Sequence, residues 1–178
     1  MIQYKLEMFM DYLKKNYNYL IFTFFFLSIL FWVLEIIYSL IIRNKFVIPG
    51  AWYGPWCPIY GTTFLLILAV FRKEDHVLLN FLKIFVTVTI SEYIVSFVSE
   101  KVFNHIIWNY SNRFLNIHGR VCLGMSLLFA ITGTVMMYYF LPIIRKIYDK
   151  IEKPIKYINI VLLILFFIDA IFSLVLKV

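Results

Sequence analysis

The sequence predicts an all-α integral membrane protein: a bundle of about five transmembrane helices forming a single domain over residues 1–178. Three observations lead to this fold class. Of the 178 residues, 63% are hydrophobic and only 15% are charged. The mean hydropathy is +0.86, which excludes an ordinary soluble domain or a disordered chain. The apolar residues also gather in long runs, and a spanning helix needs about 20 of them.

The apolar runs predict the spans in order. The first, Tyr19–Ile42, contains one ionisable residue, Glu35, and is too long for the core of a cleaved signal peptide. The third, fourth and fifth spans are Val77–Ser99, Val121–Ile144 and Tyr157–Leu176. The run Thr62–Phe71 is too short to cross alone at about 1.5 Å per residue. The second span is therefore expected to be short and tilted, or completed by the segment before it.

That preceding segment, Val47–Gly61, reads VIPGAWYGPWCPIYG. Its three prolines and three glycines prevent a regular helix from end to end. Two interpretations stay open. The segment enters the membrane and offers backbone carbonyl groups to a ligand, as broken helices of transporters do, or it forms a turn that caps the short second span.

The connections between the runs carry most of the charge. Arg72–His76 is a polar turn, Glu100–Arg120 is polar and aromatic, and Arg145–Lys156 is a basic linker that we expect to be a solvated loop. With five spans, eleven lysines and arginines lie on the side of the amino terminus and six on the other. The positive-inside rule then predicts a multi-pass cell-membrane protein with a cytoplasmic amino terminus and an outside carboxyl terminus.

Ionisable residues inside the predicted spans indicate a candidate site in the outer half of the bundle. A charged side chain in hydrocarbon costs about 2.5 to 3.5 kcal/mol, so Glu35, Glu92 and Glu100 need a shared polar cavity or partners. Glu92, Ser96 and Glu100 recur every four residues and share one helix face. Arg120, at the start of the fourth span, is the natural partner of a carboxylate. The acids either line a ligand site or pair with basic groups to hold the bundle.

The residues predicted to bind a ligand combine these charges with parts of the Pro/Gly segment and of the aromatic loop. They are Glu35, Glu92, Glu100, Arg120, Pro58, Tyr60, Asn116, Trp108 and Tyr110. The simpler role for the aromatic residues near the outer boundary is an interfacial belt, comprising Trp52, Trp56, Trp108 and Tyr110. No catalytic residue is assigned.

The remaining reactive side chains have simpler interpretations. Cys57 and Cys122 are expected to be packed thiols, with a disulfide between them left open. His105 and His118 lack metal-ligand spacing, so no metal and no cofactor is expected. Asp169, deep in the last span, either hydrogen-bonds a neighbouring span or is protonated by burial.

Several motifs occur in an order that resembles one family. They are Trp32 with Glu35, GPWCPIYG at 54–61, Glu92-Tyr93, Glu100, WNYS at 108–111 and NIHGRVCL at 116–123. Over Phe31–Leu128 the chain is similar to the ABC-transporter type IV (CmpB-like) family of bacterial membrane proteins, which implies a permease subunit. Two positions depart from the family pattern. Asn109 stands where the family usually has Asp, and His118 where an uncharged polar residue is more common.

These observations favour a small multi-pass membrane transport protein or permease-like subunit. One alternative is a membrane-embedded enzyme that acts on a lipid or envelope precursor with a glutamate as general base. Another is a regulatory or assembly subunit of a membrane complex. The chain has no GxxxxGK[ST] motif, so ATP-driven transport requires a separate ATPase subunit.

The expected partners follow from the same composition. The net charge of +7 is explained by cytoplasmic loops and by membrane lipid with anionic headgroups, and not by nucleic acid. A separate ATPase subunit is implied by the family resemblance, and a homo-oligomer is left open.

Overall fold

The computed structural model describes residues 2–50 and 52–176, and over these the chain is helical apart from loops and one isolated bridge between Ile117 and Val121. The elements are α1 (Ile2–Arg43), α2 (Pro58–Val70), α3 (Val77–Phe103), α4 (Leu123–Val135), the π-helical turn η1 (Met136–Phe140) and α5 (Leu141–Leu176). The all-α class is confirmed.

Three helical stretches of the described chain are long and apolar enough to cross a membrane. They are Asp11–Arg43, Val77–Val102 and Leu123–Ser173. The fourth apolar helix, α2, has 13 residues, fewer than the roughly 20 that a full crossing needs. The predicted count of about five spans is therefore not confirmed: α2 is a short apolar helix, and the expected fourth and fifth spans belong to one continuous helical stretch.

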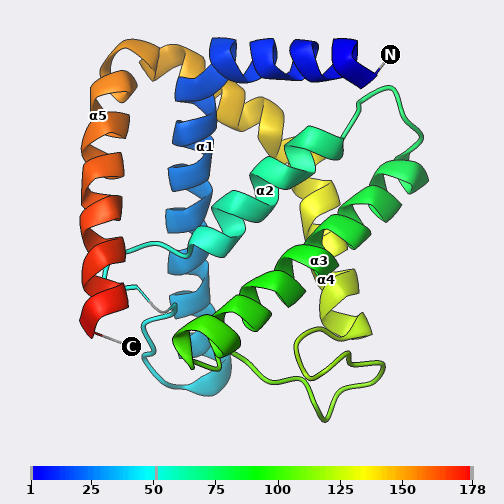
Figure 1. Cartoon of the computed structure of the whole chain (residues 1–178), viewed down its shortest axis with the longest axis vertical. Coiled ribbons are helices and arrows are strands. Elements are labelled where there is room, and N and C mark those ends of the chain that lie inside the picture. Colours follow the sequence, from blue (N-terminus) through cyan, green and yellow to red (C-terminus); the bar gives the residue numbers. More distant parts are fainter. Residues whose placement is uncertain (1, 51, 177–178) are drawn as a thin grey trace.

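The two parts of α1 run in different directions. Its amino-terminal part lies across one end of the bundle, and the remainder descends through the bundle (Figure 1). The change of direction lies near the point where the polar stretch 11–18 gives way to the apolar run that starts at Tyr19. Buried Phe22 and Leu27 of the descending part join Phe64 of α2 and Ile84 of α3 in the hydrophobic core.

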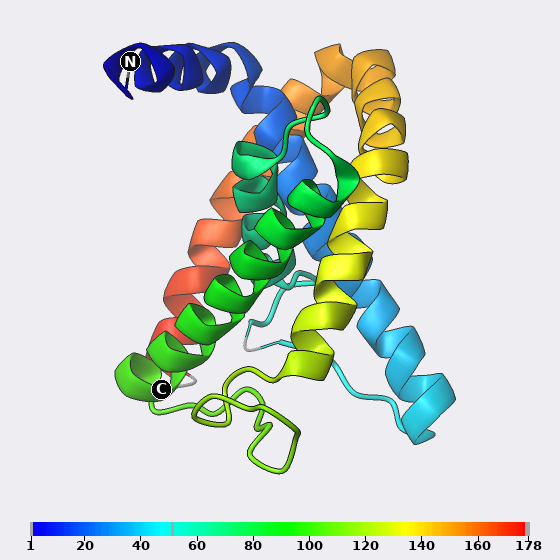
Figure 2. The same ribbon diagram turned by 90° about the vertical axis from the view of Figure 1, so that its right-hand side faces the viewer.

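The basic linker Arg145–Lys156 is helical, so the expectation of a loop is wrong. It forms the first part of α5, where the chain turns over before the rest of α5 runs back along the bundle (Figures 1 and 2). Ile144, just before the linker, and Tyr148 and Ile155 within it recur at helical spacing and are buried in the core. Because many lysines lie between these apolar residues, their helical spacing was not recognised in the sequence.

Contacts with α1 hold the linker in place. The guanidinium of Arg145 lies 4.6 Å from the ring centroid of Tyr19 and donates to Asn16 Oδ1 at 3.2 Å. Further along α5, the side-chain amide of Asn159 donates to the carbonyl oxygen of Asn18 at 2.9 Å. The linker is therefore packed against the protein along one side.

The connections fall at two opposite ends of the bundle. The α2–α3 turn and the basic linker share one end with the amino-terminal part of α1, and the 104–122 loop lies at the other end (Figures 1 and 2). The basic connections are thus far from the polar aromatic loop, as the sequence predicts.

Candidate functional site

The Pro/Gly segment runs into the bundle before α2 begins. The backbone N–H of Cys57 donates to the carbonyl oxygen of Ser28 at 3.0 Å, in the descending part of α1. Trp56 and Cys57 are buried, and Figure 1 shows α2 starting at about mid-height beside α1. α2 is therefore a half-helix with its amino terminus inside the bundle. Trp56 accordingly lies in the interior, and its assignment to an interfacial belt is wrong.

Asp169 of α5 fixes this segment. Its Oδ1 accepts the backbone N–H of Tyr53 at 3.1 Å, and its Oδ2 accepts the backbone N–H of Gly54 at 3.0 Å and the indole N–H of Trp56 at 2.7 Å. Ser173 Oγ donates to Oδ1 at 3.2 Å. Four donors thus converge on one buried carboxylate. Of the two alternatives predicted for Asp169, hydrogen bonding or protonation by burial, the structure shows hydrogen bonding.

Close packing then sets the position of the first turn of α2. A Cβ added at Gly61 would lie 2.4 Å from Ser28 Oγ and 2.5 Å from the carbonyl oxygen of Phe24, so α1 and α2 cross too closely for a side chain here. Pro58 is the first residue of α2, where its missing N–H needs no partner. These residues determine where Tyr60 stands.

Tyr60 faces Glu35 across the α1–α2 contact. Its hydroxyl donates to Glu35 Oε1, and its ring stacks on Phe31 with centroids 4.7 Å apart. Trp32 lies one turn before Glu35, and its indole N–H is buried without a hydrogen-bond partner among the described residues. α1 and α2 thus bring a carboxylate, a phenol and an indole to one place.

Glu92 contributes a second carboxylate from α3. The residue is only 4% exposed, and its Oε2 has no hydrogen-bond partner within the described part of the chain. The hydroxyl of Tyr110, from the 104–122 loop, interacts with this carboxylate. A buried carboxylate oxygen without a donor is costly, so this position calls for an additional partner.

Tyr110 pairs with Glu92. Burial raises the pKa of its hydroxyl above the ordinary value, the charge of Glu92 raises it further, and the more distant charge of Glu35 adds a smaller increase. We call Trp32, Glu35, Tyr60, Glu92 and Tyr110 the glutamate–tyrosine cluster.

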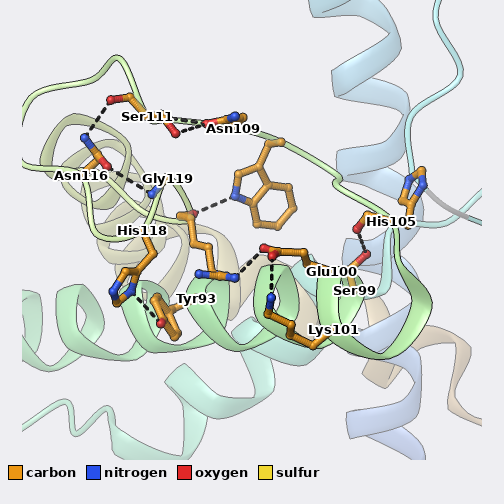
Figure 3. A network of polar contacts seen from close by, with 12 residues as sticks. Tyr93, Ser99, Glu100, Lys101, His105, Asn109, Ser111, Asn116, His118 and Gly119 are labelled. Atoms are coloured by element: carbon orange, nitrogen blue, oxygen red, sulfur yellow. Dashed lines mark hydrogen bonds and ion pairs between the residues drawn. The ribbon is translucent and has the colours of Figure 1, made fainter.

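The other predicted charges form a separate group at the end of the bundle. Arg120 Nη2 donates to Glu100 Oε2 at 2.5 Å, and its guanidinium stands 5.6 Å from the ring centroid of Tyr93 and 5.5 Å from that of Phe97. The carbonyl oxygen of Arg120 accepts the indole N–H of Trp108 at 2.8 Å. Glu100 and Arg120 thus pair with each other and fasten the loop to α3 (Figure 3).

Asn116 is used within the loop itself. Its side-chain amide donates to the carbonyl oxygens of Ser111 and Arg113, each at 3.0 Å, and its Oδ1 accepts the N–H of Gly119 at 3.1 Å. Asn109 Oδ1 accepts both the N–H and the hydroxyl of Ser111 (Figure 3). The side chain of Asn109 thus accepts both hydrogen bonds through one oxygen.

Two openings on the described surface are lined by residues other than Glu35 and Glu92. The larger, of about 550 Å³, lies between the Pro/Gly segment and α5. Its lining residues are Tyr53, Gly54, Trp56, Leu165, Ile168, Asp169 and Phe172. The smaller, of about 220 Å³, lies where α3 meets the 104–122 loop.

Cys57 and Cys122 are both buried and free.

The fold and the interrupted segment define a helical membrane protein with a half-helix that starts inside its bundle, a feature of membrane transport proteins. Residues 22–174 match the family described as Putative ABC-transporter type IV, so the chain belongs to that family and is a transport-related membrane protein. Neither the curated proteins nor the solved structures give a match.

Proposed function

We propose that this protein is a small membrane transport protein, acting alone or as a permease-like subunit, that binds its solute at the glutamate–tyrosine cluster. The observation that carries the proposal is the unpartnered, buried Oε2 of Glu92. Ionisable groups inside membrane bundles usually mark solute or ion pathways because their burial is costly. The nearby half-helix supports the same role, since broken helices form binding sites in transporters.

The proposal includes five crossing segments. These are the descending part of α1, the Pro/Gly segment with α2, then α3, then α4 with η1, and finally the part of α5 after the linker. The path of the chain in Figures 1 and 2 supports this arrangement, because consecutive segments run in opposite directions. The basic connections then lie in the cytoplasm, and the glutamate–tyrosine cluster lies in the outer half of the bundle.

An ATPase subunit, where ATP drives transport, would bind at the basic end. The linker exposes Lys146, Lys150 and Lys153, and the amino-terminal part of α1 lies at the same end (Figure 1). Membership of an ABC-transporter family supports such a partner. Affinity purification in mild detergent should then recover a protein that carries the phosphate-binding GxxxxGK[ST] motif.

The test compares the internal solute contents of cells that lack the protein with cells that produce wild type or Glu92→Gln. Inorganic ions are measured by plasma mass spectrometry and metabolites by liquid chromatography with mass spectrometry. Wild type should change the level of at least one solute, and Glu92→Gln should abolish the change at equal membrane abundance. Glu74→Gln makes the same chemical change at an exposed position of the α2–α3 turn and should behave as wild type. Identical contents in all strains would refute the proposal.

A role as an assembly subunit is the second candidate. The Glu100–Arg120 pair favours it, because these charges hold a loop to a helix. On this alternative Glu92→Gln changes the melting temperature and the recovery of partner proteins, while solute contents stay unchanged.

A further inference from the structure

We infer that the larger surface opening, between the Pro/Gly segment and α5, binds a lipophilic organic cation of the quaternary ammonium or phosphonium type beside the carboxylate of Asp169. This site is separate from the glutamate–tyrosine cluster, and the inference does not depend on the function proposed for that cluster. Three features of the opening carry it: its charge, the hydrogen bonds around that charge, and its apolar walls.

The charge of the opening comes from Asp169. The described residues that line it include this one carboxylate and no lysine, arginine or histidine. None of the ion pairs in the described chain involves Asp169. A carboxylate buried without a cationic partner is costly, so a positively charged ligand placed beside it gains an attraction that the protein itself does not supply.

The hydrogen bonds of Asp169 suit its ionised form. Oδ1 accepts the N–H of Tyr53 and the hydroxyl of Ser173, and Oδ2 accepts the N–H of Gly54 and the indole N–H of Trp56. A carboxylate offers about four lone-pair positions, and four donors occupy them here. These donors are neutral, so they satisfy the oxygens and leave the negative charge in place.

The same hydrogen bonds determine which kind of cation the opening can take. A metal ion needs oxygen ligands, and a primary ammonium group needs acceptors for its N–H bonds. The lone pairs of Asp169 are already shared with donors of the protein. A quaternary ammonium or phosphonium ion has no N–H group and requires only a nearby negative charge.

The walls of the opening match the apolar body of such a cation. Tyr53, Trp56 and Phe172 contribute aromatic rings, and Leu165 and Ile168 contribute aliphatic side chains. Quaternary cations are attracted to the faces of aromatic rings. The volume of about 550 Å³ lies within the range of about 300 to 1,000 Å³ that is typical of sites for drug-sized molecules.

The position of the opening indicates that its ligand enters from the lipid. Leu165, Ile168 and Phe172 are 46 to 56% exposed, and they belong to the stretch Leu123–Ser173, which is long and apolar enough to cross a membrane. Figure 1 shows this part of α5 at the edge of the bundle. A cation that reaches the opening through a bilayer must carry a large apolar body.

The test measures equilibrium binding of tetraphenylphosphonium to the purified full-length protein in nanodiscs of phosphatidylethanolamine and phosphatidylglycerol, with binding to empty nanodiscs subtracted. Tetraphenylborate is the matched control ligand, because it has nearly the same size and shape and the opposite charge. Wild type should bind tetraphenylphosphonium saturably, and tetraphenylborate at least about tenfold more weakly. Equal binding of the two ions, or binding of neither, would overturn the inference.

Two pairs of variants locate the binding. Phe172→Leu removes a ring from the wall without changing a hydrogen-bonding group of Asp169, and it should weaken tetraphenylphosphonium binding about three- to tenfold. Phe167→Leu makes the same change at an exposed position that does not line the opening, and it should bind as wild type. Asp169→Asn should bind at least about tenfold more weakly, whereas Asp11→Asn should bind as wild type.

Equal affinities of wild type and Phe172→Leu would overturn the inference, whether or not Asp169→Asn folds. Binding that disappears in phosphatidylcholine nanodiscs would assign the opening to the choline headgroup of a lipid and would also overturn it. Saturable tetraphenylphosphonium binding combined with identical solute contents in cells with and without the protein would reject the proposed function and leave this inference standing. A solute change that depends on Glu92, without any tetraphenylphosphonium binding, would do the reverse.

Discussion

Replacing Asp169 with asparagine should release the Pro/Gly segment from α5. The carboxylate accepts hydrogen bonds from Tyr53, Gly54 and Trp56. An asparagine keeps one acceptor oxygen and turns an NH₂ group toward the other donors, so either the Tyr53 bond to Oδ1 or the Gly54 and Trp56 bonds to Oδ2 are lost. Each hydrogen bond to a charged group contributes about 1.5 to 3 kcal/mol, and the local loss is therefore about 1.5 to 6 kcal/mol.

The reactivity of Cys57 reports this release. Its thiol is buried within the segment, directly after Trp56, and should react slowly with a maleimide in a Cys122→Ser background. Since 1.4 kcal/mol corresponds to a factor of ten, a loss of about 3 kcal/mol raises the detached population roughly a hundredfold, and labelling should accelerate accordingly.

The unfolding midpoint should also fall, by roughly 3 °C or more. Asp11→Asn removes a carboxylate at an exposed position and serves as the matched control, with labelling and stability unchanged. Unaltered Cys57 labelling and an unaltered midpoint in Asp169→Asn would refute the argument that this carboxylate holds the segment.

Three further predictions concern packing and pairing. Gly61→Ala should destabilise the protein by about 1 to 3 kcal/mol, because its methyl group overlaps α1. Gly124→Ala, with open space around it, should be neutral or slightly stabilising, and equal effects of the two would contradict the close crossing. Tyr60→Phe should lower the free energy of unfolding more in wild type than in the Glu35→Gln background, which a double-mutant cycle measures. Equal losses in the two backgrounds would contradict the contact between Tyr60 and Glu35. Arg120→Gln should lower the unfolding midpoint and speed proteolysis of the 104–122 loop, and an equally resistant loop would count against the Glu100 pair.

Composition and run length were sufficient for the fold class because a membrane interior requires long apolar helices. Glu92 and Ser96, four residues apart, are both buried, as their spacing predicts. The linker was mispredicted because its lysines dominate the composition. The spacing of Ile144, Tyr148 and Ile155, which is helical, was the signal that could have identified it.

The partners of the polar groups could not be read from the sequence. Asp169 and Trp56 are 113 residues apart in the chain, and no local pattern indicates that they meet. Tyr110, which interacts with Glu92, lies in a loop that Asn109 and Asn116 hold through hydrogen bonds from Ser111 and Gly119. Such contacts depend on how helices pack, whereas periodicity reports only which face of each helix is buried.

Cross-linking between α1 and α3 tests most directly the central claim that Glu35 and Glu92 share one site. Glu35→Cys and Glu92→Cys are combined in a chain whose native cysteines are serines, treated in membranes with a short bifunctional thiol reagent, and digested for mass spectrometry. The joined peptides should form readily, and they should be missing when Glu35→Cys is paired with Glu74→Cys at the opposite end of the bundle. Failure of the first pair to join, with both thiols reactive, would contradict the account.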